Sequence, residues 1–337
     1  MLEAVVTKFG SPDVIQIQEV PILEPEEGQI LVKVSYSGIN FADILSRMGL
    51  YPNAPKPPFT LGFEISGTIH KLGSKVSGFR VGDRVLGLSK IFGGYSNYCC
   101  FTPDSLFKLP DAVSLEDAAA IPVTYLTAYF TVVHPGALRE GESILIHGAA
   151  GGVGTAAIQL SKIRGAGKIF GTASDSKHDF LRENGVIPIS YSENFVESIK
   201  NHTDGRGVHL ALDPVGGDNL MKSYKCLSAG GRVFTYGISS MAQGKTKSRF
   251  RMAKVWLTYP KFDPLKMLGS NKGVHGFYLG SFKDRPALER AYRDLMNWST
   301  EGKIKPVIGK IFNLDQAAEA HHYIQDRKNI GKVLLKG

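Results

Sequence analysis

Cysteine is scarce in this chain of 337 residues. The three cysteines are Cys99, Cys100 and Cys226, and no two of them are spaced as C-x-x-C. The odd number argues against a disulfide framework, and the spacing argues against a zinc ribbon. We expect three buried, unreactive thiols.

Long apolar runs are also missing. No stretch approaches the ~18 consecutive apolar residues of a membrane-spanning helix. The first residues, MLEAVV, lack the basic segment followed by an apolar segment that marks a secretory leader. We therefore expect a soluble, cytoplasmic protein, with peripheral attachment to membranes as the alternative.

Nucleic-acid-binding signatures are absent as well. The formal net charge of +9 suits an anionic partner, which could be a phosphorylated cofactor, a membrane surface or a nucleic acid. The sequence holds no helix-turn-helix, RNP or zinc-finger signature, so we expect no nucleic-acid partner.

Apolar residues and glycine, by contrast, are plentiful. Hydrophobic residues make up 43% of the chain, enough to bury a large core, and the length favours two domains. The 38 glycines gather in short clusters, as in 148–154 and 230–231, rather than at a fixed period. We expect tight backbone turns and not a solenoid.

The first 120 residues favour a β-rich domain of the barrel type. Turn residues such as Gly82-Asp83 and Pro110-Asp111 separate short segments with strand character. The expected strands are Ile30 to Ser35, Glu64 to His70, Arg84 to Leu88 and Tyr95 to Phe101.

From about Leu115 the pattern changes to α/β. A helix is expected over 116–133, with Pro122 near its start, where a helix tolerates proline. Strands and helices then alternate, which predicts parallel βαβ units and a doubly wound Rossmann sheet. The expected strands are 143–147, 168–172, 208–213 and 232–236, and the expected helices are 155–163, 178–184 and 220–227. Beyond residue 267 we expect a strand over 274–279, a helix over 287–300 and a closing strand over 331–335.

The segment Ser143 to Gly154 carries the strongest functional signal. An apolar strand leads into a glycine-rich turn, and a helix beginning near Gly152 follows. Gly151 would let the backbone approach a pyrophosphate, Gly154 would let the helix pack closely on the strand, and the helix N-terminus would supply N–H donors. The first glycine of the G-x-G-x-x-G pattern is here Ala149. A dinucleotide-binding loop is favoured over a merely structural turn.

The second strand of this unit indicates which dinucleotide binds. An NAD site wants a carboxylate near the end of that strand to bind the ribose 2′-hydroxyl. Ala173 occupies the position, and Ser174 and Lys177 follow, a hydroxyl and an ammonium that suit a 2′-phosphate. Asp175 argues in the other direction. The sequence favours NADPH over NADH.

With these residues in view, the chain resembles the zinc-independent quinone oxidoreductases of the medium-chain dehydrogenase/reductase superfamily, and within them the synaptic vesicle membrane protein VAT-1 group. The resemblance covers nearly the whole chain. It rests on residues 37–43, 61–67, 81–85, 126–129, 149–154, 171–178, 213–217 and 331–335. It implies a GroES-like catalytic domain made of 1–120 and 265–337, and a Rossmann NADPH-binding domain made of 121–264.

The resemblance also bears on metal binding. In zinc alcohol dehydrogenases of this superfamily, a Cys and a His bind the catalytic metal at the positions that match Asn40 and Phe63. Neither residue here is a zinc ligand, although Glu64 remains, and the four-cysteine structural lobe is replaced by 93–98. We expect no metal, and we expect the His321-His322 pair to be surface or capping residues.

By the same resemblance, Asn40 and Tyr51 line the nicotinamide side of the cleft, where they orient the substrate or stabilise an enolate. Tyr191 is expected near the adenosine phosphate and Lys332 near the pyrophosphate. Thr127 and the backbone groups of Phe277 and Leu279 are expected near the carboxamide. The full set of expected cofactor contacts is Thr127, Ala150, Gly151, Gly152, Val153, Gly154, Ser174, Lys177, Tyr191, Gly237, Phe277, Leu279 and Lys332.

These expectations define a reaction and an alternative to it. Without zinc as Lewis acid, the plausible substrates are those that accept hydride readily, namely quinones and α,β-unsaturated carbonyls. The resemblance also implies a homodimer. Residues 245–259, however, mix five cations with apolar and aromatic residues at helical spacing, which suits an anionic membrane. A cap over the substrate is the favoured interpretation of this segment, and a membrane-associated or lipid-transfer role of the VAT-1 type is the alternative.

Overall fold

The computed structural model describes residues 1–52, 54–89, 92–242, 244–246 and 259–337. The chain divides into two compact units. Unit 1 consists of 1–123, 244–247 and 293–337, and unit 2 consists of 124–243 and 248–292. Both units contain segments that lie far apart in the sequence, so neither is a simple N- or C-terminal half.

Unit 2 is built on a parallel six-stranded sheet with the order β11-β10-β9-β12-β13-β14. The first strand of the unit, β9, lies in the middle, and the chain turns first to one side of it and then to the other. This reversal is the topological switch point at which doubly wound sheets bind ligands. The strands are β9 (Ser143–His147), β10 (Lys168–Ala173), β11 (Ile187–Ser190), β12 (Val208–Asp213), β13 (Leu227–Thr235) and β14 (Gly273–Gly276).

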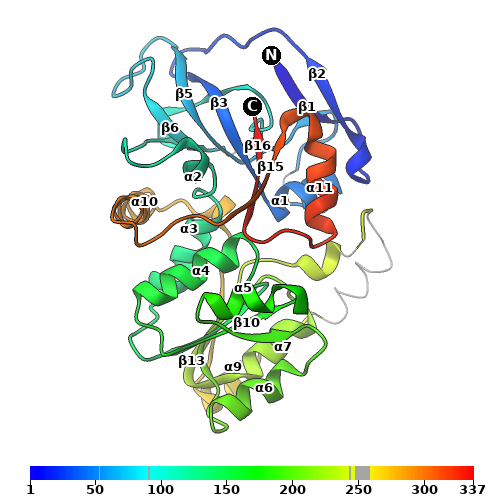
Figure 1. Cartoon of the computed structure of the whole chain (residues 1–337), viewed down its shortest axis with the longest axis vertical. Coiled ribbons are helices and arrows are strands. Elements are labelled where there is room, and N and C mark those ends of the chain that lie inside the picture. Colours follow the sequence, from blue (N-terminus) through cyan, green and yellow to red (C-terminus); the bar gives the residue numbers. More distant parts are fainter. Residues whose placement is uncertain (53, 90–91, 243, 247–258) are drawn as a thin grey trace. The chain divides into compact units, whose positions relative to one another are not determined.

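Helices connect these strands, as a parallel sheet requires. α4 packs against β9 and α3, whereas α6 and α7 contact each other, and α7 packs on β12 and β13 (Figure 1). The helices are α3 (Thr124–Ala128), α4 (Gly152–Ile163), α5 (His178–Glu183), α6 (Phe195–His202), α7 (Asp218–Lys225) and α9 (Pro264–Ser270). The sequence-based prediction of a Rossmann sheet is confirmed.

The single helix expected over 116–133 is wrong. The structure has α2 (Leu115–Ala119), then α3, and then a π-helical turn over Tyr129–Val133. Pro122 lies between α2 and α3 because proline has no N–H and its ring clashes with the preceding turn.

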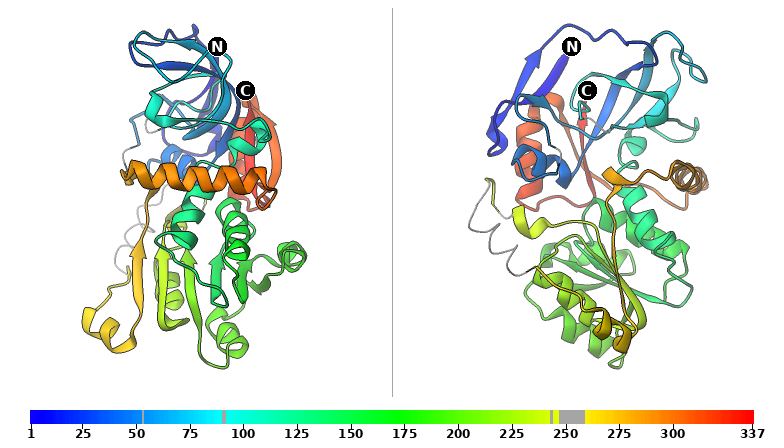
Figure 2. Two further views of the ribbon diagram at one scale, coloured as in Figure 1. Left: turned by 90° about the vertical axis from the view of Figure 1, so that its left-hand side faces the viewer. Right: turned by 180° about the vertical axis from the view of Figure 1, so that it is seen from behind.

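The C-terminal boundary of the nucleotide-binding unit also differs from the expected one. Residues 265–292 were expected in the catalytic domain, but they belong to unit 2. β14 pairs in parallel with β13 through four residue pairs, and it is the outermost strand of the sheet (Figure 2). α10 (Arg285–Thr300) then begins in unit 2 and ends in unit 1.

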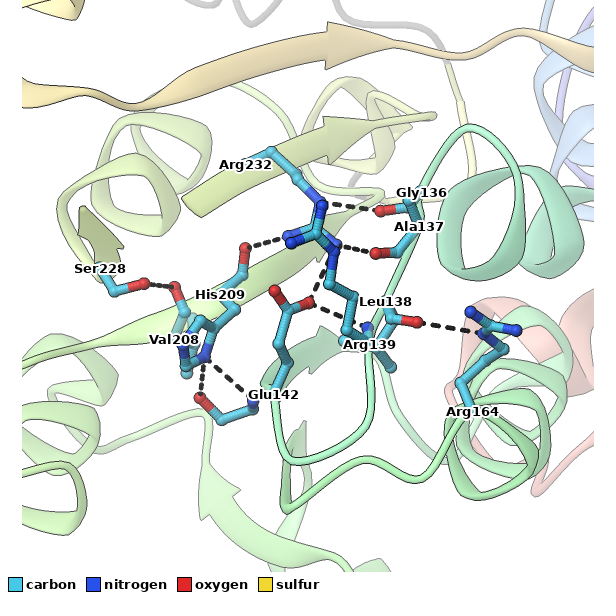
Figure 3. A network of polar contacts seen from close by, with 11 residues as sticks. Gly136, Ala137, Leu138, Arg139, Glu142, Arg164, Val208, His209, Ser228 and Arg232 are labelled. Carbon is cyan, nitrogen blue, oxygen red and sulfur yellow. Dashed lines mark hydrogen bonds and ion pairs between the residues drawn. The ribbon is translucent and has the colours of Figure 1, made fainter. Parts of the chain in front are cut away.

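One arginine holds the turns beside the unit 2 sheet together (Figure 3). The Arg232 guanidinium donates to the carbonyl oxygens of Gly136 at 2.8 Å, Ala137 at 2.6 Å and His209 at 3.2 Å. It also lies 3.1 Å from Glu142 Oε2. Arg232 thereby supplies donors to three backbone carbonyls, and two of these bonds, to Gly136 and His209, are part-buried, where an unpaired carbonyl is costly.

The described residues of unit 1 form two β-sheets. In the larger sheet the order is β15-β16-β3-β5-β6-β8, with β7 also paired to β3; a smaller sheet has the order β2-β1-β4. The strands are β1 (Leu2–Val6), β2 (Ile15–Glu19), β3 (Ile30–Ile39), β4 (Phe59–Thr60), β5 (Glu64–Leu72), β6 (Arg84–Leu88), β7 (Tyr98–Phe101), β8 (Leu106–Lys108), β15 (Ile308–Asn313) and β16 (Lys332–Lys336). Its helices besides α2 are α1 (Phe41–Arg47) and α11 (Ala317–Gln325).

The C-terminal strand returns to the N-terminal part of the chain, as the family resemblance implied. β16 pairs antiparallel with β3, which places Leu334 opposite Gly38. A core that includes Val6, Leu61 and Leu335 joins residues from both ends of the chain. None of the helices in the described ranges is long and apolar enough to cross a membrane.

Candidate functional site

The glycine-rich turn of unit 2 lies at the carboxyl end of β9. Gly148 has φ of +64°, a left-handed conformation that glycine adopts without strain. Gly151 is the N-cap of α4, and its amide donates to the Gly148 carbonyl at 2.9 Å. The first amides of a helix have no acceptor within it, so those of Gly152, Val153 and Gly154 can bind an anion.

Gly154 is required by close packing within this turn. A Cβ at this position would lie 2.5 Å from the carbonyl oxygens of both Gly148 and Ala149. At Gly151, a Cβ would lie 3.2 Å from the Gly148 carbonyl. Both glycines therefore lie against carbonyl oxygens of the turn itself, and the space is tighter at 154 than at 151.

The expected 2′-phosphate residues lie beside the ends of β10 and β11. Ser174 follows β10 directly, and the Lys177 amide donates to its carbonyl at 2.9 Å. The Tyr191 amide donates to the Ala173 carbonyl at 3.2 Å, so Tyr191 lies beside the same strand end. The Asp175 carboxylate, which argued against NADPH, lies 3.7 Å from His178 Nε2.

The other expected cofactor residues of unit 2 also follow strand ends, apart from Thr127, which is buried on α3. Gly237 comes after β13, and a Cβ there would lie 2.8 Å from the Pro214 carbonyl. Phe277 follows β14 and Leu279 comes two residues later. The Phe277 amide already donates to the Thr235 carbonyl at 2.9 Å, so the backbone group that Phe277 can offer is its carbonyl.

Asp213 ends β12 and accepts four hydrogen bonds. The Val215 and Gly216 amides reach Oδ1 at 2.8 Å each, and Asn219 Nδ2 and Ser223 Oγ reach Oδ2 at 2.9 and 2.7 Å. The side chain is fully buried. Four donors satisfy both oxygens of the carboxylate, which therefore fixes the turn after β12. The sequence carried a signal for this residue in its Asp-Pro-Val-Gly-Gly run, but gave it no role.

His147, the last residue of β9, is another buried polar residue that the sequence did not single out. Its Nδ1 lies 3.0 Å from Thr172 Oγ1 and its Nε2 lies 2.9 Å from Ser223 Oγ. Burial lowers the pKa of this imidazole, with the Asp213 charge acting in the opposite direction. A neutral ring therefore links the ends of β9 and β10 to α7.

In unit 1, Asn40 and Lys332 meet at a third residue, Glu64. Lys332 Nζ donates to Asn40 Oδ1 at 2.6 Å and pairs with the Glu64 carboxylate. Asn40 Nδ2 donates to Glu64 Oε1 at 2.7 Å and, over a longer 3.3 Å, to the Gly38 carbonyl. The Val123 amide donates to Glu64 Oε2 at 2.7 Å. We call these three side chains the buried triad.

The buried triad changes the interpretation of two residues. Lys332 was expected near a pyrophosphate, but in unit 1 its ammonium pairs with Glu64 and donates a hydrogen bond to Asn40. Glu64, considered earlier only as a metal ligand, is the acceptor at the centre of the triad. Nothing in the local sequence indicates the ion pair between Lys332 and Glu64, because the two residues lie on β16 and β5, which are far apart in the sequence.

Asp43 lies on α1 next to this cluster and is fully buried. Its carboxylate accepts from the Asn40 amide at 2.8 Å and from the Gly62 amide at 3.1 Å. Burial nevertheless dominates and raises the pKa of Asp43 to about 7. The carboxyl therefore titrates near neutral pH while it holds the start of α1.

Tyr51 lies in an aromatic cluster. Its ring centroid is 5.3 Å from that of Phe63, which is 4.5 Å from Phe92, and Phe92 is 5.4 Å from Phe59. Phe63 directly precedes Glu64. Tyr51 and the buried triad are thus linked through the adjacent residues Phe63 and Glu64, and the aromatic rings, inclined to one another by 45–68°, form an apolar cluster beside polar groups.

Comparisons with known proteins agree with this architecture. The model of the alcohol dehydrogenase GroES-like domain matches residues 26–111, and that of the zinc-binding dehydrogenase matches 185–335. The rat synaptic vesicle membrane protein VAT-1 homolog is 38% identical over 98% of this chain and 83% of its own length. The zebrafish homolog (Danio rerio) is 37% identical, over 98% and 69%.

The pig quinone oxidoreductase is 32% identical over 98% of this chain and 96% of its own length. This chain belongs to the medium-chain dehydrogenase/reductase family. Within it, the relatives are quinone oxidoreductases and VAT-1 homologues.

Two solved structures of this family are similar over the whole chain. The Escherichia coli quinone oxidoreductase complexed with NADPH has a TM-score of 0.87 at 31% identity and is matched over 100% of both chains. The human VAT-1 homolog-like protein has a TM-score of 0.85 at 29% identity, over 100% of this chain and 98% of that one.

The structure also bears on the predictions made for metal ligands, for the His321-His322 pair and for the three cysteines. Over the described residues, no group of three or more His, Cys, Asp or Glu side chains could hold a metal ion. The expectation of two surface or capping histidines is wrong for His321, which is fully buried with its Nε2 3.3 Å from the Tyr95 hydroxyl. Cys99 and Cys226 are buried and all three thiols are free, as expected apart from a half-buried Cys100.

Proposed function

We propose that this protein is a zinc-independent oxidoreductase that uses NADPH to reduce a quinone or an α,β-unsaturated carbonyl compound. The observation that carries the proposal is the turn between β9 and α4, where Gly154 is held against two carbonyl oxygens and three free helical amides follow the Gly151 cap. The NADPH complex of the E. coli relative supports it.

The choice of NADPH rests on the end of β10. No carboxylate lies at Ala173, and Asp175 lies within ion-pairing distance of His178. We assign the ribose 2′-phosphate to Ser174 and Lys177, and the pyrophosphate to the backbone of 150–154. Tyr191, Gly237, Thr127, Phe277 and Leu279 remain our candidates for the rest of the cofactor.

The reduction would proceed as hydride transfer. When bound, NADPH supplies a hydride to the electrophilic carbon of the substrate. We assign Asn40 and Tyr51 to the substrate, whose oxygen gains negative charge as the hydride arrives. The long bond from Asn40 Nδ2 to the Gly38 carbonyl is the one that can be exchanged for such an oxygen, and the rings around Tyr51 suit a flat quinone.

A panel of quinones and enones, followed by the absorbance of NADPH, tests this function. We expect steady oxidation of NADPH with at least one substrate class and a smaller kcat in Asn40→Ala and Tyr51→Phe. The variant Ser161→Ala, which removes a buried hydroxyl on α4 whose partner is the Ala157 carbonyl, serves as the control. Absence of oxidation with every acceptor would refute the proposal.

A second candidate is a lipid-binding or lipid-transfer role at a membrane. It is favoured by the names of the VAT-1 relatives, which call them synaptic vesicle membrane proteins, and by the net charge of +9. The basic segment 245–259 that suggested it lies almost wholly outside the described residues. Co-sedimentation with vesicles that contain or lack anionic lipid tests it, and failure to bind either kind would remove it.

We also propose that the protein is a cytoplasmic homodimer, with peripheral membrane contact only in the second candidate function. Light scattering of the purified chain tests the oligomeric state. A mass of one chain of 36.7 kDa would contradict the dimer.

A further inference from the structure

A row of hydrogen bonds connects the phosphate loop to a buried carboxylate in unit 2. Gly148 N lies 3.3 Å from Thr172 Oγ1, and Thr172 Oγ1 lies 3.0 Å from His147 Nδ1. His147 Nε2 lies 2.9 Å from Ser223 Oγ, which lies 2.7 Å from Asp213 Oδ2. We call this row the loop-to-carboxylate chain. The proposed function does not yet use it.

The carboxylate end determines where the first proton lies. Ser223 has a single hydroxyl proton, and two acceptors surround it, Asp213 Oδ2 at 2.7 Å and the Asn219 carbonyl at 2.9 Å. Whichever of these receives the proton, none is left for His147. The bond between His147 and Ser223 therefore has Nε2–H as its donor and Oγ as its acceptor.

The histidine then determines the other half of the chain. A neutral imidazole with its proton on Nε2 accepts at Nδ1, so the Thr172 hydroxyl donates to it. The Thr172 oxygen keeps a lone pair for the Gly148 amide. The Ser223 proton goes to Asp213 Oδ2, the nearer acceptor and a carboxylate, so every proton in this row of hydrogen bonds points toward Asp213. Burial, which lowers the pKa of His147, favours the neutral ring that this arrangement needs.

Thr172 holds the turn by two groups. Its hydroxyl faces the Gly148 amide, and its carbonyl accepts from the Ala149 amide at 3.0 Å. These are the two residues whose carbonyl oxygens pack against Gly154. Hydrogen bonds in a row polarise one another, so the Asp213 charge strengthens the hold on Gly148.

We propose that Thr172, His147 and Ser223 are positioning residues for the dinucleotide, which transmit the Asp213 charge to the phosphate loop and fix the direction of its amides. The inference rests on the proposed function, because it concerns the binding of NADPH at this loop. It goes beyond it by assigning a role to three side chains that are not among the proposed cofactor contacts.

Thr172→Val tests the proposal with little change in shape, since both side chains are β-branched. Valine removes both hydrogen bonds of the hydroxyl, of which one is to the loop, and for the loss of that one we expect NADPH to bind about three- to ten-fold more weakly. Thr172→Ser restores a hydroxyl and should recover most of the affinity. At saturating NADPH, kcat should stay at the wild-type value in both variants, which distinguishes loop positioning from damage to catalysis.

Ser161→Ala is the matched control, because it removes a buried hydroxyl that donates to the Ala157 carbonyl on α4. If Thr172→Val binds NADPH as tightly as wild type, or if Ser161→Ala loses affinity to the same extent, the positioning role is overturned. The second result would mean that any buried hydroxyl lost from unit 2 weakens binding.

Two substitutions of His147 test the two halves of the loop-to-carboxylate chain separately. Asparagine can place an acceptor near the Nδ1 position, toward Thr172, whereas glutamine can place a donor near the Nε2 position, toward Ser223. The proposal requires the acceptor for Thr172, so His147→Asn should keep more NADPH affinity than His147→Gln. The reverse order would contradict it.

The tautomer can be observed without any cofactor. In 15N-labelled wild-type protein at neutral pH, the ring of His147, identified by its loss in His147→Asn, should carry one proton, on Nε2. A proton on Nδ1, or on both nitrogens, would overturn the proposed direction of the hydrogen bonds in the loop-to-carboxylate chain. Wild-type protein that shows the expected tautomer but binds no NADPH would refute the proposed function instead, so the two failures are distinguishable.

Discussion

Lys332 and Glu64 form an ion pair in the interior of unit 1, where their side chains are 4% and 0% exposed. The two residues are 268 positions apart in the sequence. They meet because β3 pairs with β16 on one side and with β5 on the other, which places Leu334 and Glu64 both opposite Gly38. The pair therefore joins the C-terminal strand to the centre of the unit.

Breaking this pair should be far more costly than breaking one at the surface. Lys332→Met leaves a buried carboxylate without its cation, and we expect a loss of about 3–5 kcal/mol in the free energy of unfolding. Lys71→Met, which removes an exposed pair with Glu24, should cost about 1 kcal/mol or less. Urea unfolding of both variants checks this, and similar losses would contradict the burial argument.

Asp43 should make stability depend on pH. Its pKa in the folded protein is raised to about 7 from the usual value of 3.8, so between these pH values the folded state holds a proton that the unfolded state has lost. The contribution of Asp43 is thus present at low pH and is lost as the pH rises through about 7, by at most ~1.4 kcal/mol per pH unit.

Asp43→Asn imitates the protonated carboxyl and removes this titration. The free energy of unfolding of the wild type, measured relative to the variant, should therefore decrease from pH 4 to pH 7. Denaturant unfolding at several pH values checks this. A difference between the two proteins that does not vary with pH would show that Asp43 has an ordinary pKa.

Gly154 should be indispensable to the phosphate loop. In Gly154→Ala the new Cβ would meet two carbonyl oxygens at 2.5 Å, so the turn must move, and we expect NADPH affinity to fall by about 100-fold. Gly269→Ala on α9 is the control, because no atom lies within 4 Å of its Cβ position. Calorimetric titration of both variants with NADPH measures this, and equal affinities would show that the phosphate loop does not require glycine at position 154.

Arg232 should matter to the stability of unit 2 and not to its ligand. Arg232→Met removes a donor from three backbone carbonyls and breaks the ion pair with Glu142, and we expect a loss of about 3 kcal/mol in the free energy of unfolding (Figure 3). Arg182→Met, which removes an exposed pair with Asp179, should have little effect. A loss below about 1 kcal/mol for Arg232→Met would contradict the role of Arg232 in holding these turns together.

The sequence predicted the regular parts of the fold well, for a physical reason. β6, β9 and β12 have the bounds expected for them, because each is an apolar run ended by glycine, proline or a polar residue. β11 was not predicted, because a proline within a run, here Pro188, argues against a strand. As an edge strand, β11 tolerates a residue without an N–H.

The site was predictable only where it is local. The turn from Gly148 to Gly154 is continuous in the sequence, and so its glycines could be assigned in advance. The buried triad, and the links from His147 to Thr172 and Ser223, depend on which strands and helices become neighbours. Propensity and periodicity carry no information about such long-range pairs, which emerge only from the topology of the two units.

The most direct measurement is the binding of reduced dinucleotides to the purified protein by calorimetric titration. We expect NADPH to bind to one site per chain and more tightly than NADH, with the preference reduced by about ten-fold in Lys177→Met. No heat with either dinucleotide, from protein shown to be folded, would contradict the account at its centre.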